Sequence, residues 1–180
     1  MRNLALIGKA QSGKDTAAQW LVENRAYTRM AFADPLKEMT LSMDPYVPTG
    51  YGVTVRLSRL LADVGWDYAK TTYPEVRRIL QHTGQAVREL DEDFWTRALA
   101  RKLERAVGPV VVSDVRYWNE AAMLRSHGFT LVRIVRPERP TTPAAAALHR
   151  SENDLNGYSE DVVVYNTGSV ETLHQRIAAV

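Results

Sequence analysis

The sequence lacks cysteine altogether, so disulfides and thiolate metal sites are excluded and the composition fits a reducing compartment. It also lacks any apolar run that approaches the length of a membrane span, and the first such run, Leu4 to Ile7, ends at Gly8. We therefore expect a soluble cytoplasmic protein with no membrane partner.

Like charges do not gather in blocks, and 23 Lys and Arg residues nearly balance 21 Asp and Glu residues, which leaves a formal net charge of +2. The sequence therefore lacks the basic tract that is typical of nucleic-acid binding, and we expect no nucleic-acid partner. The 180 residues suffice for one compact domain with a sizeable core.

Short β-branched and aliphatic runs alternate with longer segments of helical periodicity. This alternation is typical of an α/β fold with a mainly parallel sheet. Two segments rich in turn-forming residues, Asp44 to Gly52 and Pro137 to Gly157, are predicted to be insertions. Five strands are predicted, at Asn3 to Ile7, Thr28 to Phe32, Val110 to Ser113, Phe129 to Val135 and Val162 to Tyr165.

The segment GKAQSGKDT, Gly8 to Thr16, follows the first predicted strand and leads into a predicted helix. At such a junction the backbone N–H groups lack partners and the helix dipole is positive, which favours bound phosphate. The segment fits G-x-x-x-x-G-K, the pattern of a nucleotide phosphate-binding loop, although Asp15 stands where Ser or Thr is usual. Lys14 can reach phosphate oxygens as a point charge. The structural alternative is a glycine-rich turn with an exposed lysine.

Six motifs follow one another along the chain: GKAQSGKDTAA, FADPLKE, LQHTGQAVRELDEDFW, VVSDVRYWNEA, HRSE and VVVYNTGSVETLHQRI. Together they resemble the phage deoxynucleoside monophosphate kinases, a branch of the P-loop nucleoside monophosphate kinase-like enzymes. The resemblance implies a three-layer P-loop kinase fold in a single domain, residues 1–180, with an acceptor-binding region at about 34–95 and a mobile lid at about 136–157.

The resemblance also implies an activity, transfer of the γ-phosphoryl group of ATP to a deoxynucleoside monophosphate with the help of Mg²⁺. It is compatible with a homodimer, and with the host cytoplasm if a phage encodes the protein. Lys14 is then catalytic, and ATP binding falls to Gly8, Lys9, Ala10, Gln11, Ser12, Gly13, Lys14, Asp15 and Thr16.

Two acids are predicted to lie near the metal. Phosphate oxygens repel a carboxylate unless a cation intervenes, so Asp15 is predicted to ligate Mg²⁺ or one of its waters. Its alternative role is that of a favourable acid in the first helical turn. Asp114 follows the apolar run Val110 to Val112, where ligands of open α/β sheets bind, and is predicted to hold a metal-bound water or to contact the acceptor. Capping a helix near Asn119 is its structural alternative.

A helix predicted from Pro74 to about Leu90 has two distinct faces. Its apolar stripe, predicted to face the core, consists of Val76, Ile79, Leu80, Thr83, Val87 and Leu90. Spacing alone makes the polar face an ordinary solvated one, whereas the resemblance makes it the acceptor wall, with arginine on the monophosphate and glutamine amides on the base. That face carries Arg77, Gln81, Gln85 and Arg88.

Other acceptor contacts are implied by the resemblance alone. Asp34 is predicted to cap a helix that begins at Pro35, and Lys37, one turn further, is implied to meet the acceptor phosphate. Trp95 either walls the nucleoside pocket or packs in the core with Leu99 and Leu103. The remaining residues assigned to the acceptor site are Asp34, Asp114, Arg116 and Glu152.

Arginines near the end of the strand at Val135 are candidates for closing over the γ-phosphate. They are Arg133, Arg136 and Arg150, and the last two are predicted to be catalytic. The alternative is a surface loop with incidental arginines.

Two other classes of function stay open at this point. One is a P-loop kinase of another small acceptor, such as a nucleoside or a cofactor precursor. The other is a nucleotide-binding module that transfers nothing, against which the arginines after Val135 argue.

Overall fold

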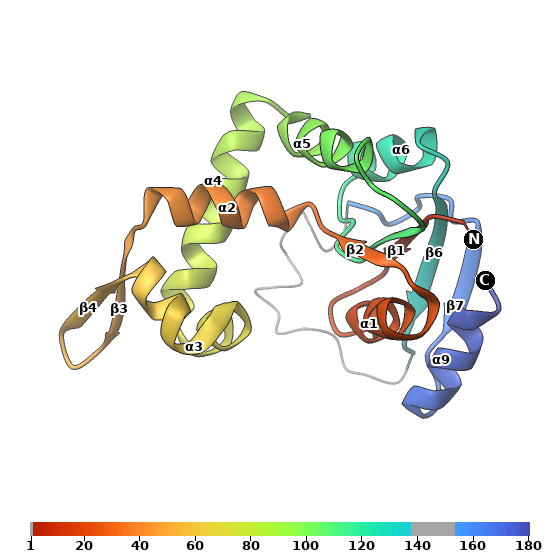
Figure 1. Cartoon of the computed structure of the whole chain (residues 1–180), viewed down its shortest axis with the longest axis horizontal. Helices are drawn as coiled ribbons and strands as arrows, with labels where there is room; N and C mark the ends of the chain where they lie inside the picture. Colours follow the sequence, from red (N-terminus) through yellow and green to blue (C-terminus); the bar gives the residue numbers. More distant parts are fainter. Residues whose placement is uncertain (1, 138–153) are drawn as a thin grey trace. The chain divides into compact units, whose positions relative to one another are not determined.

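The structure is a computed structural model that describes residues 2–137 and 154–180. The chain divides into two compact units (Figure 1). Residues 1–32 and 99–180 form the first, which we call the sheet unit, and residues 33–98 form the second, which we call the helical unit. Helix α5 (Phe94–Leu103) runs across the boundary between them. The organisation as a single domain stays a prediction.

The sheet unit is built on five parallel strands in the order β2-β5-β1-β6-β7. Its central strands are wholly buried apolar runs, as expected of a parallel sheet that is covered on both faces. The five predicted strands are confirmed, with differences only at their ends. They are β1 Leu4–Ile7, β2 Thr28–Met30, β5 Val110–Val112, β6 Thr130–Val135 and β7 Val162–Tyr165.

Helices cover both faces of this sheet (Figure 1). Helices α1 (Lys14–Arg25) and α9 (Val170–Ala178) lie on one face, and α6 (Trp118–Ser126) lies on the other. Alternate strand residues point to opposite faces, so one set packs against α1 and α9. The core on that side includes Leu4, Leu6, Ala17, Leu21, Val111, Val132, Ile134, Leu173 and Ile177. The α/β fold with a mainly parallel sheet is confirmed.

The helical unit combines helices with a β-hairpin. The helices are α2 (Ala33–Met43), α3 (Leu57–Thr72) and α4 (Pro74–Leu90), followed by the start of α5. A Cβ added to Gly84 of α4 would lie 3.1 Å from Cδ2 of Leu36 on α2, so the two helices pack closely at this point. The small core of the unit is formed by Val47, Leu57, Leu60, Ala69 and Val76.

The helical unit confirms one prediction and corrects three. Helix α4 has the predicted bounds, but its last residue, Leu90, is 90% exposed, because the helix ends there and the chain turns at Asp91. The segment Asp44 to Gly52 is not a mere insertion, since it supplies strand β3 (Tyr46–Gly50) and the turn that leads to β4 (Val53–Arg56). Helix α2 begins at Ala33, so Asp34 lies within its first turn and is not its N-cap.

No helix within residues 2–137 and 154–180 is both long enough and apolar enough to cross a bilayer.

Candidate active site

At two positions, the loop between β1 and α1 adopts a backbone conformation that favours glycine. Gly8 and Gly13 have φ values of 142° and 106°, which L side chains rarely adopt. A Cβ would lie 2.4 Å from the carbonyl oxygen of Ile134 at Gly8, and 2.6 Å from Nδ2 of Asn166 at Gly13. The glycines of the sequence pattern are therefore required both by backbone conformation and by the close approach of neighbouring chain segments.

Lys14, the first residue of α1, folds back over this loop. Its ammonium group donates hydrogen bonds to the carbonyl oxygens of Gly8 and Lys9, both at 2.7 Å. The side chain of Ser12 is buried, and within the described residues its Oγ has no hydrogen-bond partner. Buried polar atoms are rarely left unpaired, so an oxygen of a phosphate bound in this loop is a fitting partner for the hydroxyl.

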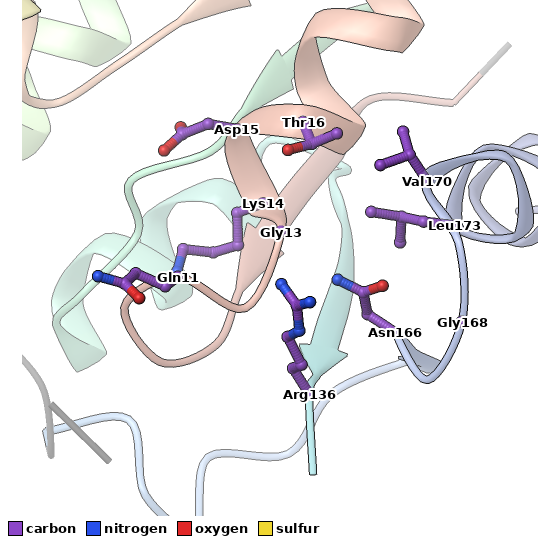
Figure 2. Close-up of a pocket in the computed structure, with 10 residues that line it drawn as sticks. All are labelled: Gln11, Gly13, Lys14, Asp15, Thr16, Arg136, Asn166, Gly168, Val170 and Leu173. Carbon is purple, nitrogen blue, oxygen red and sulfur yellow. The ribbon is translucent and has the colours of Figure 1, made fainter. Parts of the chain in front are cut away.

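A cleft of about 200 Å³ opens beside the loop (Figure 2). Its walls come from the loop, the first turn of α1, the end of β6, the connection from β7 to α9 and the start of α9. Arg136 extends from the end of β6 toward the loop, so its guanidinium and Lys14 bring two positive charges to one small cleft (Figure 2). That arrangement suits the phosphate end of a nucleotide. The lining residues are Gln11, Gly13, Lys14, Asp15, Thr16, Arg136, Asn166, Gly168, Val170 and Leu173.

The carboxylate of Asp15 is held by a residue that sequence reasoning missed. Ser113 Oγ donates a hydrogen bond of 2.9 Å to Asp15 Oδ1. Ser113 is only 1% exposed and directly follows β5, the strand that pairs with β1. Its place at the carboxyl end of a strand, next to Asp114, was the available sequence signal.

Asp114 joins the ends of two neighbouring strands. Its Oδ1 accepts a hydrogen bond of 3.0 Å from the backbone N–H of Phe32, which lies just beyond β2. Helix α6 begins at Trp118 and is capped by Tyr117 together with Glu120, so Asp114 is not its N-cap. The backbone N–H of exposed Arg116 donates to the Glu120 carboxylate at 2.8 Å.

The carboxylates near the phosphate loop decide whether a divalent cation fits there. No group of three or more His, Cys, Asp and Glu side chains gathers into a metal site in the described part of the chain. Mg²⁺ does not need such a group, because it keeps several waters and takes one or two carboxylates beside substrate phosphates. Asp15 and Asp114 supply hard oxygen donors of that kind.

Asn166 ties the phosphate loop to the far end of the chain. Its Nδ2 donates to the carbonyl oxygen of Ser12 at 2.9 Å, and its backbone N–H donates to that of Val135 at 2.7 Å. Sequence reasoning gave Asn166 no role, nor Gly168, Val170 or Leu173, although all four fall within VVVYNTGSVETLHQRI. Only the fold shows that this motif borders the loop.

The arginine candidates have different outcomes. Arg133 lies within β6, where its Nε donates to Glu160 at 2.8 Å and its Nη2 donates to the carbonyl oxygens of Leu155 and Tyr158. The guanidinium of this γ-phosphate candidate therefore fastens the chain around Tyr158. The same pairing lowers the pKa of the Glu160 carboxyl below its usual value. The predicted lid, with Arg150 and Glu152, lies outside the described residues apart from its two ends.

The predicted acceptor residues of α4 become less exposed to solvent from Arg77 to Arg88. Arg77 and Gln81 are exposed, and Gln85 is half-buried with its Nε2 3.3 Å from Oε1 of Glu89. Arg88 is 8% exposed, and its Nη1 donates to the carbonyl oxygen of Glu92 at 3.4 Å. The polar face of α4 is therefore not a uniformly solvated one.

Two further candidates are held within the helical unit. Lys37 lies over the ring of Trp66, with its Nζ 5.8 Å from the ring centroid. Trp95 is 3% exposed, and its Nε1 donates to the carbonyl oxygen of Gly84 at 3.1 Å. The burial of Trp95 matches the core alternative.

Comparison with known proteins identifies the family of the chain. A model of the family described as deoxynucleotide monophosphate kinase matches residues 55–177. The chain is also 30% identical to a putative deoxynucleotide monophosphate kinase of Acanthamoeba polyphaga mimivirus, over 97% of this chain and 93% of that protein. The chain belongs to the deoxynucleotide monophosphate kinase family. It is therefore a nucleotide kinase, an ATP-dependent phosphotransferase.

Solved structures support the fold of this kinase. A sugar kinase from Janibacter shares 16% identity at a TM-score of 0.53, with 99% of this chain and 93% of that chain covered. Shikimate kinase from Aquifex aeolicus shares 14% identity at a TM-score of 0.50, with coverage of 98% and 94%. At this level of identity the likeness shows the P-loop kinase fold alone.

Proposed function

We propose that the kinase transfers the γ-phosphoryl group of ATP to a deoxynucleoside monophosphate, giving the deoxynucleoside diphosphate and ADP. The observation that carries the proposal is the cleft lined by both Lys14 and Arg136, beside a glycine-constrained loop at the start of α1. Family membership supports the choice of a nucleotide acceptor.

In the proposed reaction an oxygen of the acceptor monophosphate attacks the γ-phosphorus of ATP. The bond from that phosphorus to the bridging β–γ oxygen breaks, and its electron pair stays on ADP. Charge spreads over the transferring group, where the Lys14 ammonium and the Arg136 guanidinium stabilise it. A dianionic monophosphate is itself a sufficient nucleophile, so we assign no general base.

The loop from Gly8 to Thr16 binds the ATP phosphates in this proposal, through backbone N–H groups and Lys14. Mg²⁺, when bound, neutralises phosphate charge, and Asp15 and Asp114 are the residues that would hold it or its waters. Asn166 keeps the Ser12 carbonyl in place and so maintains the loop conformation. Arg150 and the lid remain predictions.

On the acceptor side, we propose that Arg88 binds the monophosphate and that Gln81 and Gln85 read the base. Arg88 is the strongest candidate, because burial strengthens a charge-assisted contact by reducing competition from water. We retain the remaining acceptor assignments as proposals of lesser support. They are Asp34, Lys37, Arg77, Trp95, Asp114, Arg116 and Glu152.

The decisive experiment measures ADP release from Mg²⁺ and ATP with a panel of deoxynucleoside monophosphates, ribonucleoside monophosphates and deoxynucleosides. We expect at least one deoxynucleoside monophosphate to be phosphorylated and no deoxynucleoside to react, because the latter lacks the acceptor phosphate. Reaction of a deoxynucleoside would indicate a kinase of another acceptor. Tight ATP binding without transfer to any acceptor would indicate a regulatory module.

A further inference from the structure

We infer that Ser113 is a positioning residue that orients the Asp15 carboxylate toward the metal of Mg·ATP. This inference rests on the proposed function, because it takes the role of Asp15 in binding Mg²⁺ as given. Ser113 Oγ lies 2.9 Å from Asp15 Oδ1, although the two residues are 98 positions apart in the chain.

The surroundings of the pair explain why the contact matters. Ser113 is 1% exposed at the end of β5, while Asp15 is exposed in the first turn of α1. A rigid, buried hydroxyl therefore fixes one oxygen of a carboxylate that solvent would otherwise leave free to rotate. Among the described residues, Asp15 Oδ2 accepts no hydrogen bond, so it is the oxygen left for a cation.

The chemistry of such pairs is general. A hydrogen bond to one oxygen of a ligating carboxylate sets its orientation, and loss of such an outer partner typically costs about 10- to 100-fold in metal affinity or activity. In this chain the outer partner is supplied by the strand next to β1, so the sheet itself sets the direction of the metal ligand.

The experiment measures ATP binding by calorimetry in EDTA and over a Mg²⁺ titration, which needs no turnover. We expect Ser113→Ala to leave ATP affinity in EDTA unchanged and to raise the Mg²⁺ concentration for half-maximal enhancement of binding about tenfold. Ser113→Thr, which keeps the hydroxyl, should restore the wild-type titration. If Ser113→Ala does not fold, Ser113→Cys provides the test, since it is close in volume and a poorer donor, and we expect a smaller shift in the same direction.

A double-mutant cycle tests whether Ser113 acts through Asp15, and a matched control tests whether loss of any hydroxyl hydrogen bond in the sheet unit has the same effect. Added to Asp15→Asn, Ser113→Ala should cause no further shift in the Mg²⁺ titration. Tyr27→Phe removes another hydroxyl hydrogen bond of the sheet unit, the 2.8 Å bond from Tyr27 to the Arg2 carbonyl, and should leave the titration unchanged.

Two results would overturn the inference: an unshifted Mg²⁺ titration in folded Ser113→Ala, or an equal loss of ATP affinity with and without Mg²⁺. Both presuppose a wild-type protein that phosphorylates a deoxynucleoside monophosphate and binds ATP more tightly with Mg²⁺. A wild-type protein that does neither would instead reject the proposed function, so the two failures are distinguishable.

Discussion

The sheet unit and the helical unit hold their predicted functional residues in different ways. In the sheet unit the partners are distant in sequence: Asp15 contacts Ser113 across 98 positions, and Asn166 contacts the Ser12 carbonyl across 154. In the helical unit Gln85 contacts Glu89 and Arg88 contacts the Glu92 carbonyl, each four positions away, while Trp95 donates to the Gly84 carbonyl 11 positions away.

The long-range contacts of the sheet unit preorganise the phosphate loop. A loop fixed by contacts from β5 and from the connection after β7 presents its donors in one geometry, which is what stabilisation of a charged transition state requires. Gln85, whose amide contacts Glu89 one turn along the same helix, can change partners at small cost, which suits recognition of an acceptor. The predictions below test this contrast, beginning with the largest effect.

Lys14→Ala should break the donor side most severely. We expect a loss of at least about 3 kcal/mol of transition-state stabilisation, or more than about a hundredfold in kcat/KM, because the charge on the transferring group loses one of the cations assigned to stabilise it. The measurement is ADP release under saturating Mg²⁺. Lys70→Ala, in a pair with exposed Asp67, serves as the control, and near-normal activity of folded Lys14→Ala would contradict the role of the loop.

Gly13→Ala should show how tightly the sheet unit constrains its loop. The new Cβ would meet Asn166 Nδ2 at 2.6 Å, whereas a Cβ at Gly108, which also has a positive φ, would meet nothing within 4 Å. We expect about 1–2 kcal/mol of destabilisation from backbone strain at Gly108, and at least about 1 kcal/mol more at Gly13 from the clash. Urea unfolding of both variants checks this, and equal losses would mean that the contact with Asn166 yields freely.

Arg88→Lys should separate the acceptor side from the donor side. Lysine keeps the charge but loses the planar fork, so the KM for the deoxynucleoside monophosphate should rise while that for ATP stays nearly constant. The loss of one charge-assisted contact corresponds to about 1.5–3 kcal/mol in kcat/KM.

Arg59→Lys, at an exposed pair on α3, is the matched control for Arg88→Lys. Equal weakening of ATP and acceptor, or no change in either, would reject α4 as the acceptor wall.

The smallest predicted effect concerns the pH dependence of stability. The hydrogen bond from Arg133 holds the pKa of Glu160 below its unfolded value, so the pair stabilises the fold above the unfolded pKa and ceases to do so as the pH falls through the folded pKa. Relative to Glu160→Gln, the wild type should gain about 0.2–1 kcal/mol at neutral pH, and this advantage should vanish in acid.

The control for this pair lies in the helical unit. Glu75 and Arg78 pair three positions apart on α4, and the Arg78 side chain is 66% exposed against 20% for Arg133, so water screens this pair more and Glu75→Gln should change stability less than Glu160→Gln does. Urea unfolding between pH 7 and acid pH measures both, and an advantage that grows as the pH falls would contradict the assigned cause.

Local sequence patterns determined much of this protein. The alternation of apolar runs predicted all five strands of the sheet, and the spacing of apolar residues predicted α4 with its observed bounds. The glycines and lysine of Gly8 to Lys14 located the loop. These features are local, since periodicity and backbone conformation are properties of neighbouring residues.

What tertiary structure alone decided is the identity of the partners. No local pattern around a polar residue shows which distant group it will contact. This holds for the hydroxyl of Ser113, the amide of Asn166 and the guanidinium of Arg133. Parallel pairing of β5 with β1 brings Ser113 to Asp15, and the crossover through β7 brings Asn166 to Ser12. The role of Arg133 could not be read from the sequence for the same reason, because its partner Glu160 reaches it only through the pairing of β6 with β7.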